Sequence, residues 1–162
     1  LDPEKIREAL ASFSGVKRRF DIQLKSDRCI YIDDYAHHPR EISASLTSIR
    51  GNFPGYRMTA IFQPHLYTRT RDFAGGFAES LSCADRLILL DIYPAREEPI
   101  PGVTSKLMYD CLDENIEKAM CSRKDVLECI EKEKENIEVL VSLGAGDIEN
   151  DIPEIKRILE NR

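Results

Sequence analysis

The three histidines of the chain all lie in stretches that are rich in other reactive side chains. Residues 31–42 read YIDDYAHHPREI, so three carboxylates, two tyrosines and two imidazoles follow one another closely. The third histidine lies in residues 62–72, FQPHLYTRTRD, beside two arginines. Such side chains can bind a metal, move protons or hold an anionic ligand. These two stretches are therefore the first candidates for a functional site.

A metal site is one interpretation of the first stretch. His37 and His38 are neighbours, and neighbouring side chains of an extended segment point to opposite sides, so the two do not readily share one ion. We assign His38 to a structural role, bonded to the backbone near a helix start. A mixed site of Asp33 or Asp34 with the distant His65 stays open, although the set of residues that we predict for this chain contains no metal ligand.

Nucleophilic and phosphoryl-transfer chemistry lack their usual motifs in this sequence. There is no GxSxG, and no glycine-rich turn ends in GK[ST]. Residues 144–149, GAGDIE, resemble the start of a dinucleotide-binding fingerprint, but Glu149 stands where the third glycine belongs. A tight turn between a strand and a helix is the simpler interpretation. We predict no catalytic residue within this chain alone.

An anion site agrees better with the residues. Arg69 and Arg71 lie at the start of an expected helix, where backbone N–H groups favour anions, and arginine binds carboxylate or phosphate in a bidentate manner. Arg18 and Arg19 add positive charge. Asp34 ends an expected strand, a usual place for an acid that accepts ribose hydroxyl groups. The residues alone predict a domain that holds a nucleotide and a small acid.

Alternating strand and helix patterns must position these residues. Apolar strands separated by amphipathic helices predict an α/β fold, a Rossmann-like, doubly wound, mostly parallel sheet with an antiparallel hairpin at its N-terminal edge. In such sheets ligands bind beyond the carboxyl ends of the strands, so the reactive stretches should meet at one rim. The expected strands are 18–25, 29–33, 57–64, 86–94, 115–121 and 137–143, and the expected helices are 3–13, 41–53, 70–84, 105–112, 124–136 and 152–161.

Length and composition limit the class of protein. The 162 residues, 42% hydrophobic and 32% charged, predict one globular domain over 1–162. A net charge of -6 argues against nucleic acid as a partner, and no apolar run approaches the roughly 18 residues that cross a membrane. Five cysteines without a CxxC pair indicate a reducing, cytoplasmic location. Because the chain starts at Leu1, we expect it to be a piece of a longer protein.

Five segments, in order, resemble the carboxy-terminal domain of the Mur ligases, the ATP-dependent enzymes of peptidoglycan precursor synthesis. Within that family the resemblance is strongest to the branch that joins L-alanine to UDP-N-acetylmuramate. The combination is highly specific, although each piece alone is not. The segments are FSGVKRRF (13–20), DDYAHHP (33–39), FQPHLYTRTRDF (62–73), DIYPAREEPIPGVTS (91–105) and LGAGDI (143–148).

The resemblance implies a parent enzyme of three domains. Its amino-terminal domain would bind the UDP-sugar, and its central domain would carry the P-loop and most ligands of Mg²⁺. This chain would be the third domain, which closes over ATP and brings the amino acid. The implied cofactors are ATP and Mg²⁺, and the implied partners are UDP-N-acetylmuramate, L-alanine and the two other domains. The isolated chain is expected to be inactive.

The resemblance also assigns roles to single residues. Asp33 is expected to face away from the ligand. Two alternatives stay open: a ligase domain that recycles murein tripeptide, and a non-catalytic module that binds a nucleotide or an amino acid. The assigned roles are ATP binding by Arg19 and Asp34, L-alanine binding by Tyr35, His37 and Arg69, and support of that pocket by His65 and Arg71.

Overall fold

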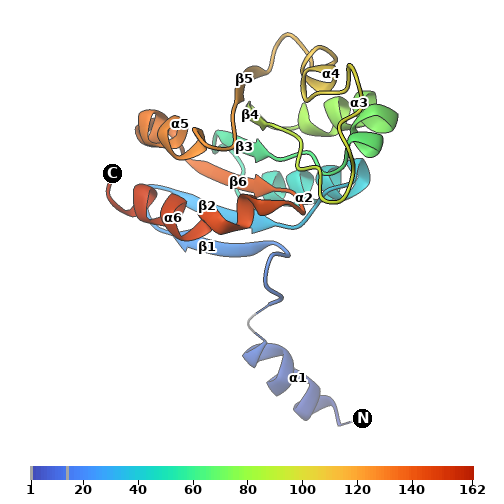
Figure 1. Cartoon of the computed structure of the whole chain (residues 1–162). Helices are drawn as coiled ribbons and strands as arrows, with labels where there is room; N and C mark the ends of the chain where they lie inside the picture. The colour runs from blue at the N-terminus through green and yellow to red at the C-terminus, as the bar shows by residue number, and fades with distance from the viewer. Residues whose placement is uncertain (1, 14) are drawn as a thin grey trace.

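Strands and helices alternate along the computed structural model, which describes residues 2–13 and 15–162 (Figure 1). Every element that the sequence predicts is present, with shifts at the ends. The strands are β1 (Asp21–Lys25), β2 (Ile30–Asp34), β3 (Met58–Phe62), β4 (Arg86–Leu90), β5 (Glu117–Cys121) and β6 (Val139–Leu143). The helices are α1 (Pro3–Ser12), α2 (Pro39–Asn52), α3 (Tyr67–Leu81), α4 (Lys106–Tyr109), α5 (Val126–Glu133) and α6 (Ile152–Glu160), with two short 3-10 turns, η1 (Lys134–Asn136) and η2 (Asp147–Asp151).

The six strands form one sheet in the order β1-β2-β6-β3-β4-β5. Strand β1 pairs antiparallel with β2, and the other pairs are parallel. Leu143, the last residue of β6, lies opposite both Asp34 of β2 and Phe62 of β3. The three central strands therefore end at the same level. This topology confirms the predicted fold class, including the antiparallel edge hairpin.

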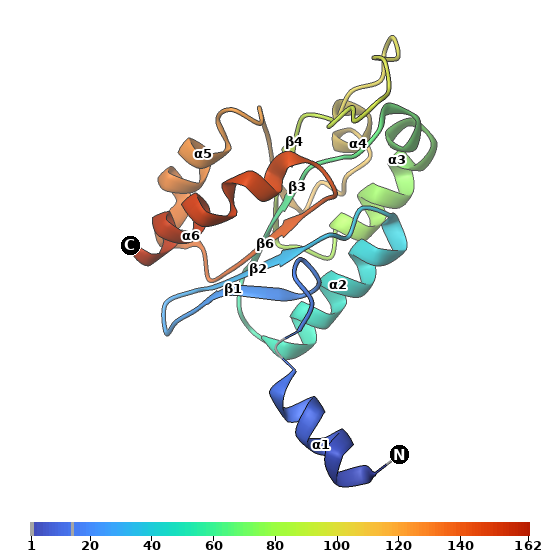
Figure 2. The same cartoon turned by 60° about the horizontal axis from the view of Figure 1, so that its bottom comes forward.

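Helices cover both faces of the sheet. Helices α2, α3 and α4 lie on one face, and α5 and α6 lie on the other (Figures 1 and 2). The apolar face predicted for α2 is confirmed, because Ile42, Leu46 and Ile49 are buried against the sheet. Burial of each such side chain contributes roughly 1.5–3 kcal/mol. Neighbouring strands β2 and β6 thus lead into helices on opposite faces, which places a crevice between their carboxyl ends.

The first strand begins three residues later than predicted. Arg18 and Phe20 have positive φ angles of 60° and 48°, and Val16 pairs with Arg19 across a tight turn. The N–H of Arg18 donates to the carboxylate of Asp21 at 3.0 Å. Alternating apolar and polar residues concealed this turn, because left-handed backbone at non-glycine residues leaves no mark in a hydrophobic pattern.

Helix α3 begins at Tyr67, three residues before the predicted start. The helix continues through the glycine pair at 75–76, and its irregular residue is Phe73, with φ -121° and ψ 17°. A Cβ atom at Gly76 would lie 3.4 Å from Cγ of Pro39. The glycine therefore allows α3 to approach the start of α2 closely, which brings the two reactive stretches together.

No helix among the described residues is both long and apolar enough to cross a membrane. All five cysteines are free thiols.

Candidate functional site

The reactive stretches meet at the carboxyl rim of the sheet, as predicted. The loop after β3 and the loop after β4 continue side by side beyond the strands, because the N–H of Tyr93 donates to the Pro64 carbonyl at 2.8 Å and the N–H of Leu66 donates to the Tyr93 carbonyl at 3.0 Å. On the other side, the N–H of Gly144 donates to the Asp34 carbonyl at 3.3 Å. Loops after four parallel strands therefore form one surface.

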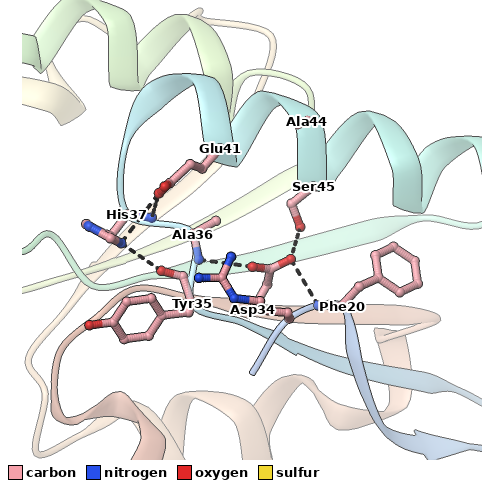
Figure 3. Close-up of a pocket in the computed structure, with 9 residues that line it drawn as sticks. Phe20, Asp34, Tyr35, Ala36, His37, Glu41, Ala44 and Ser45 are labelled. Carbon is pink, nitrogen blue, oxygen red and sulfur yellow. Dashed lines mark hydrogen bonds and ion pairs between the residues drawn. The ribbon is translucent and has the colours of Figure 1, made fainter. Parts of the chain in front are cut away.

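Four aromatic rings form a row along this rim. Ring centroids lie 5.1 Å apart for Tyr35 and His37, 6.0 Å apart for His37 and His65, and 5.8 Å apart for His65 and Tyr93. The Nδ1 of His37 donates to the carbonyl of Tyr35 at 2.9 Å (Figure 3). Because Nδ1 is the donor, the uncharged His37 ring keeps Nε2 as a hydrogen-bond acceptor.

A cavity of about 320 Å³ opens at one end of the row (Figure 3). Its volume suits a small ligand or one part of a nucleotide. Four of the predicted binding residues line it, namely Arg19, Asp34, Tyr35 and His37. The exposed side chain of Arg19 has no hydrogen bond or ion pair with the part of the chain that the structure describes. The remaining lining residues are Phe20, Ala36, Glu41, Ala44 and Ser45.

The carboxylate of Asp34 closes the floor of this cavity. It accepts hydrogen bonds from the N–H of Phe20 at 3.2 Å, from the N–H of Ala36 at 3.0 Å and from the hydroxyl of Ser45 at 2.8 Å. Three donors from the hairpin, the loop and α2 thus meet on one side chain (Figure 3). Asp34 therefore organises the pocket, and its contact with a ribose stays a prediction.

Asp33 points to the opposite face of the sheet, as expected. Its carboxylate is fully buried, pairs with Nε of Arg18 at 3.0 Å and accepts a hydrogen bond from Ser142 at 2.6 Å. The hydroxyl of Tyr31 lies 3.0 Å from that of Ser142. Burial raises the pKa of Asp33, against the opposing effect of Ser142 and Arg18. This aspartate therefore serves the interior of the domain.

Arg69 and His65 bring two unsatisfied nitrogen atoms to the rim. Nη1 of Arg69, in the first turn of α3, and Nδ1 of His65 are buried and have no hydrogen-bond partner among the described residues. Burial lowers the pKa of His65, and the charge of Arg69 and the neighbouring His37 lower it further. Buried polar groups nearly always find partners. Because a guanidinium nitrogen can only donate, Nη1 of Arg69 marks a place where an acceptor, such as a carboxylate, can bind.

Arg71, unlike Arg69, has a partner for its guanidinium. Its side chain is half exposed and pairs with its neighbour Asp72 at 2.7 Å. The supporting role predicted for Arg71 stays a prediction that this contact does not favour. His38 has the structural role expected of it: its Nδ1 accepts from the N–H of Arg40 at 3.4 Å at the start of α2.

Two residues of the rim make contacts that the sequence did not predict. Arg18, the neighbour of a predicted residue, donates to Asp33 and to the Gly144 carbonyl and stacks over the ring of Tyr35. Glu97, in the loop after β4, accepts hydrogen bonds from the N–H and the hydroxyl of Thr68 at the start of α3. The two consecutive arginines at 18–19 could have suggested a role for Arg18. Glu97 has an acidic neighbour and no distinctive motif, so the sequence gives no reason to select it.

No group of three or more His, Cys, Asp or Glu side chains is arranged to hold a metal ion in residues 2–13 and 15–162. The carboxylates of Asp33 and Asp34 are occupied by the hydrogen bonds described above. The mixed site with His65 therefore has no support in the geometry.

Comparisons with known proteins identify the family of the chain and several similar proteins. Residues 18–148 match the family model described as Mur ligase, glutamate ligase domain. Over 162 residues the chain is 54% identical to the UDP-N-acetylmuramate–L-alanine ligase of Phocaeicola vulgatus, and it spans 35% of that protein. The UDP-N-acetylmuramate-alanine ligase of Thermotoga maritima is similar in structure, with a TM-score of 0.77 and 29% identity over 100% of this chain and 34% of that one. The murein peptide ligase of Psychrobacter arcticus shares the fold, with a TM-score of 0.73 and 21% identity over 96% of this chain and 32% of that one.

Proposed function

The chain belongs to the Mur ligase family, as its glutamate ligase domain, and on this premise we propose that it serves an ATP-dependent ligase that joins L-alanine to UDP-N-acetylmuramate. The chain spans about a third of the length of the relatives that it matches. We therefore assign the sugar-binding domain, the P-loop and the Mg²⁺ ligands to two further domains of a longer protein. Five free cysteines support a reducing, cytoplasmic location.

The observation that carries this proposal is the unsatisfied Arg69–His65 pair beside Tyr35 and His37. A substrate carboxylate would satisfy Nη1 of Arg69 by a charge-assisted hydrogen bond. The amine of the amino acid would then stay free on the side of the rim that faces the other domains. The chain thus contributes mainly by positioning the amine for attack on an acyl phosphate made from the muramoyl carboxylate and ATP.

The cavity beneath Tyr35 is the place that we assign to part of ATP. Arg19 is suited to the phosphates, because its exposed guanidinium lines the cavity and has no ion pair in the described chain. Asp34 would orient the ribose side. The residues present lack a P-loop, and no described cluster suits Mg²⁺. Binding of ATP and Mg²⁺ therefore depends on the central domain, and the isolated chain should not catalyse the ligase reaction.

The test of the function uses the full-length protein. Phosphate release is followed with ATP, Mg²⁺ and UDP-N-acetylmuramate, with L-alanine in one reaction and the murein tripeptide in another. Release with L-alanine alone is expected. Release with the tripeptide alone would assign the protein to murein recycling. A folded protein that binds nucleotide but releases no phosphate in either reaction would be a non-catalytic module.

The test of the site compares two arginines of α3. Arg69→Ala removes the proposed partner of the substrate carboxylate, which is worth about 1.5–3 kcal/mol, so the KM for L-alanine should rise about 10- to 150-fold. The KM for ATP should change little. Arg71→Ala removes an exposed guanidinium two residues away and should have a much smaller effect. Equal effects of the two substitutions would contradict the role of Arg69.

A second measurement needs no turnover. The NMR titration of His65 in the 162-residue chain should give a pKa below its ordinary value. Arg69→Ala should raise that pKa, because it removes a neighbouring positive charge. Saturating L-alanine should raise it as well, because a bound carboxylate stabilises the imidazolium. If L-alanine leaves the pKa of His65 unchanged, the amino acid either binds elsewhere or does not bind to the chain alone. The same titration in the full-length protein separates these two outcomes.

A further inference from the structure

Helix α1 stands away from the rest of the domain. None of its ten residues is buried, and both views show it projecting from the sheet and its covering helices (Figures 1 and 2). Asp2 caps its start by accepting from the N–H of Glu4 at 3.0 Å, and Pro3 occupies its first turn. The local signals for a helix are therefore complete, while tertiary support from the described chain is missing.

The side chains of α1 are nevertheless arranged for burial. Ile6 and Leu10 of the helix and Phe13, the residue that follows it, are spaced by four and three residues, so they share one face. Their exposed fractions are 42%, 69% and 63%. The other side carries charged residues, including an exposed ion pair between Glu4 and Arg7. Isolated helices shorter than about 12–15 residues are marginal in water, so a ten-residue helix requires a surface on which to pack.

We propose that the Ile6–Leu10–Phe13 face is an interface that the domain preceding this one covers in the full-length ligase. The family model matches residues 18–148, so α1 lies before the matched residues. The match to the Phocaeicola vulgatus ligase runs through all 162 residues, yet spans 35% of that protein. In this proposal α1 packs against the preceding domain, and the globular domain described above begins after it. This inference rests on the proposed three-domain parent.

A second copy of this chain is less suited to cover this face, because the face is too small for a stable interface between separate molecules. A stable interface between separate molecules buries about 800 Å² on each partner, which three side chains of one short helix do not provide. A domain on the same polypeptide does not need that area, because the covalent connection supplies a high effective concentration. An apolar surface of the preceding domain is therefore the occupant to which the geometry points.

Hydrogen exchange of the α1 amides tests the interface directly. In the full-length protein the amides of Leu10 and its helical neighbours should exchange at least 10-fold more slowly than in the 162-residue chain. Leu10→Ser in the full-length protein should abolish most of that difference. Glu8→Ser, on the charged side of the same helix, is the matched control and should retain it.

Two results would overturn the inference. Equally fast exchange of α1 in both proteins would show that nothing covers the helix. Protection that appears in the 162-residue chain and grows with protein concentration would identify a second copy as the occupant. Exchange does not depend on turnover, so a full-length protein with protected α1 and no ligase activity would contradict the proposed function while leaving the interface intact.

Discussion

The guanidinium of Arg18 lies over the ring of Tyr35, 5.1 Å from its centroid, and the N–H of Tyr35 donates to the Arg18 carbonyl at 2.7 Å. The same guanidinium pairs with the buried Asp33 and donates to the Gly144 carbonyl at 2.7 Å. Left-handed backbone at a non-glycine residue costs roughly 1–2 kcal/mol, so the contacts of Arg18 must outweigh that cost. Arg18 therefore holds Tyr35 at the mouth of the cavity without facing the cavity itself.

Replacement of Arg18 by alanine should destabilise the domain strongly. The substitution leaves the carboxylate of Asp33 buried without its ion pair, which typically costs about 3–5 kcal/mol. Urea unfolding of the 162-residue chain measures the change. Arg7→Ala breaks an exposed pair with Glu4 and should cost less than about 1 kcal/mol. Similar small losses for both variants would show that Arg18 does not clamp the rim.

Glu97 should act as a helix cap supplied from another loop. Leu66 precedes α3 with φ 74° and offers no side-chain cap, whereas Glu97 accepts from the N–H of Thr68 at 3.0 Å and from its hydroxyl at 2.5 Å. Glu97→Ala should lower the free energy of unfolding, measured with urea, because the first turn of α3 loses this acceptor. In the full-length protein the KM for L-alanine should rise, because Arg69 lies in the same first turn.

The neighbouring acid supplies the control for that experiment. Glu98 is exposed and has no hydrogen bond in the described part of the chain, so Glu98→Ala should leave both stability and the KM for L-alanine nearly unchanged. Matching effects of the two substitutions would mean that general charge, and not the cap on Thr68, matters at this loop.

Stability should fall in acid partly through Glu41. Burial alone raises the pKa of this carboxyl, but hydrogen bonds from the N–H groups of His37 and His38 lower it below its ordinary value overall. A group with a depressed folded pKa contributes stability that is complete above its unfolded pKa, about 4.3 for glutamate, and that disappears as pH falls through the folded pKa. Glu41→Gln keeps the side-chain acceptor and should flatten the decrease between about pH 5 and pH 3.

Thermal unfolding across that pH range measures the difference. Glu114→Gln changes an exposed acid that has no hydrogen bond in the described chain, so it should reproduce the wild-type pH profile. If the Glu41→Gln variant and the wild-type protein lose stability identically as the pH falls, Glu41 does not contribute to the loss of stability in acid.

Gly144 should tolerate no side chain. Its φ is 137°, and a Cβ atom there would lie 2.7 Å from the carbonyl oxygen of Gln63. Gly144→Ala should therefore lower the free energy of unfolding by about 1–3 kcal/mol, as measured with urea. Gly51→Ala is the matched change: this helical glycine has no atom within 4 Å of a new Cβ, and the substitution should stabilise α2 by up to about 1 kcal/mol. Destabilisation by both would contradict the proposed close approach.

The sequence by itself determined the fold class and the rim on which the reactive residues gather. Hydrophobic periodicity is a local property, so runs such as 86–90 and 139–143 identify buried parallel strands without knowledge of their neighbours. Residues that follow the carboxyl ends of parallel strands must then share one edge of the sheet. Motif order added the family, and the neighbourhood of Tyr35 and His37 followed from their place after β2.

The tertiary structure alone decided which of these side chains have free functional groups. Arg69 and Arg71 are equivalent in sequence, yet one carries a buried, unsatisfied nitrogen and the other pairs with Asp72. The guanidinium of Arg18, and not that of Arg19, is hydrogen-bonded to residues more than a hundred positions away in the sequence. Such differences depend on the distances and desolvation between distant segments, which no local pattern records. For the same reason α1, complete in its local helix signals, revealed its missing partner only in three dimensions.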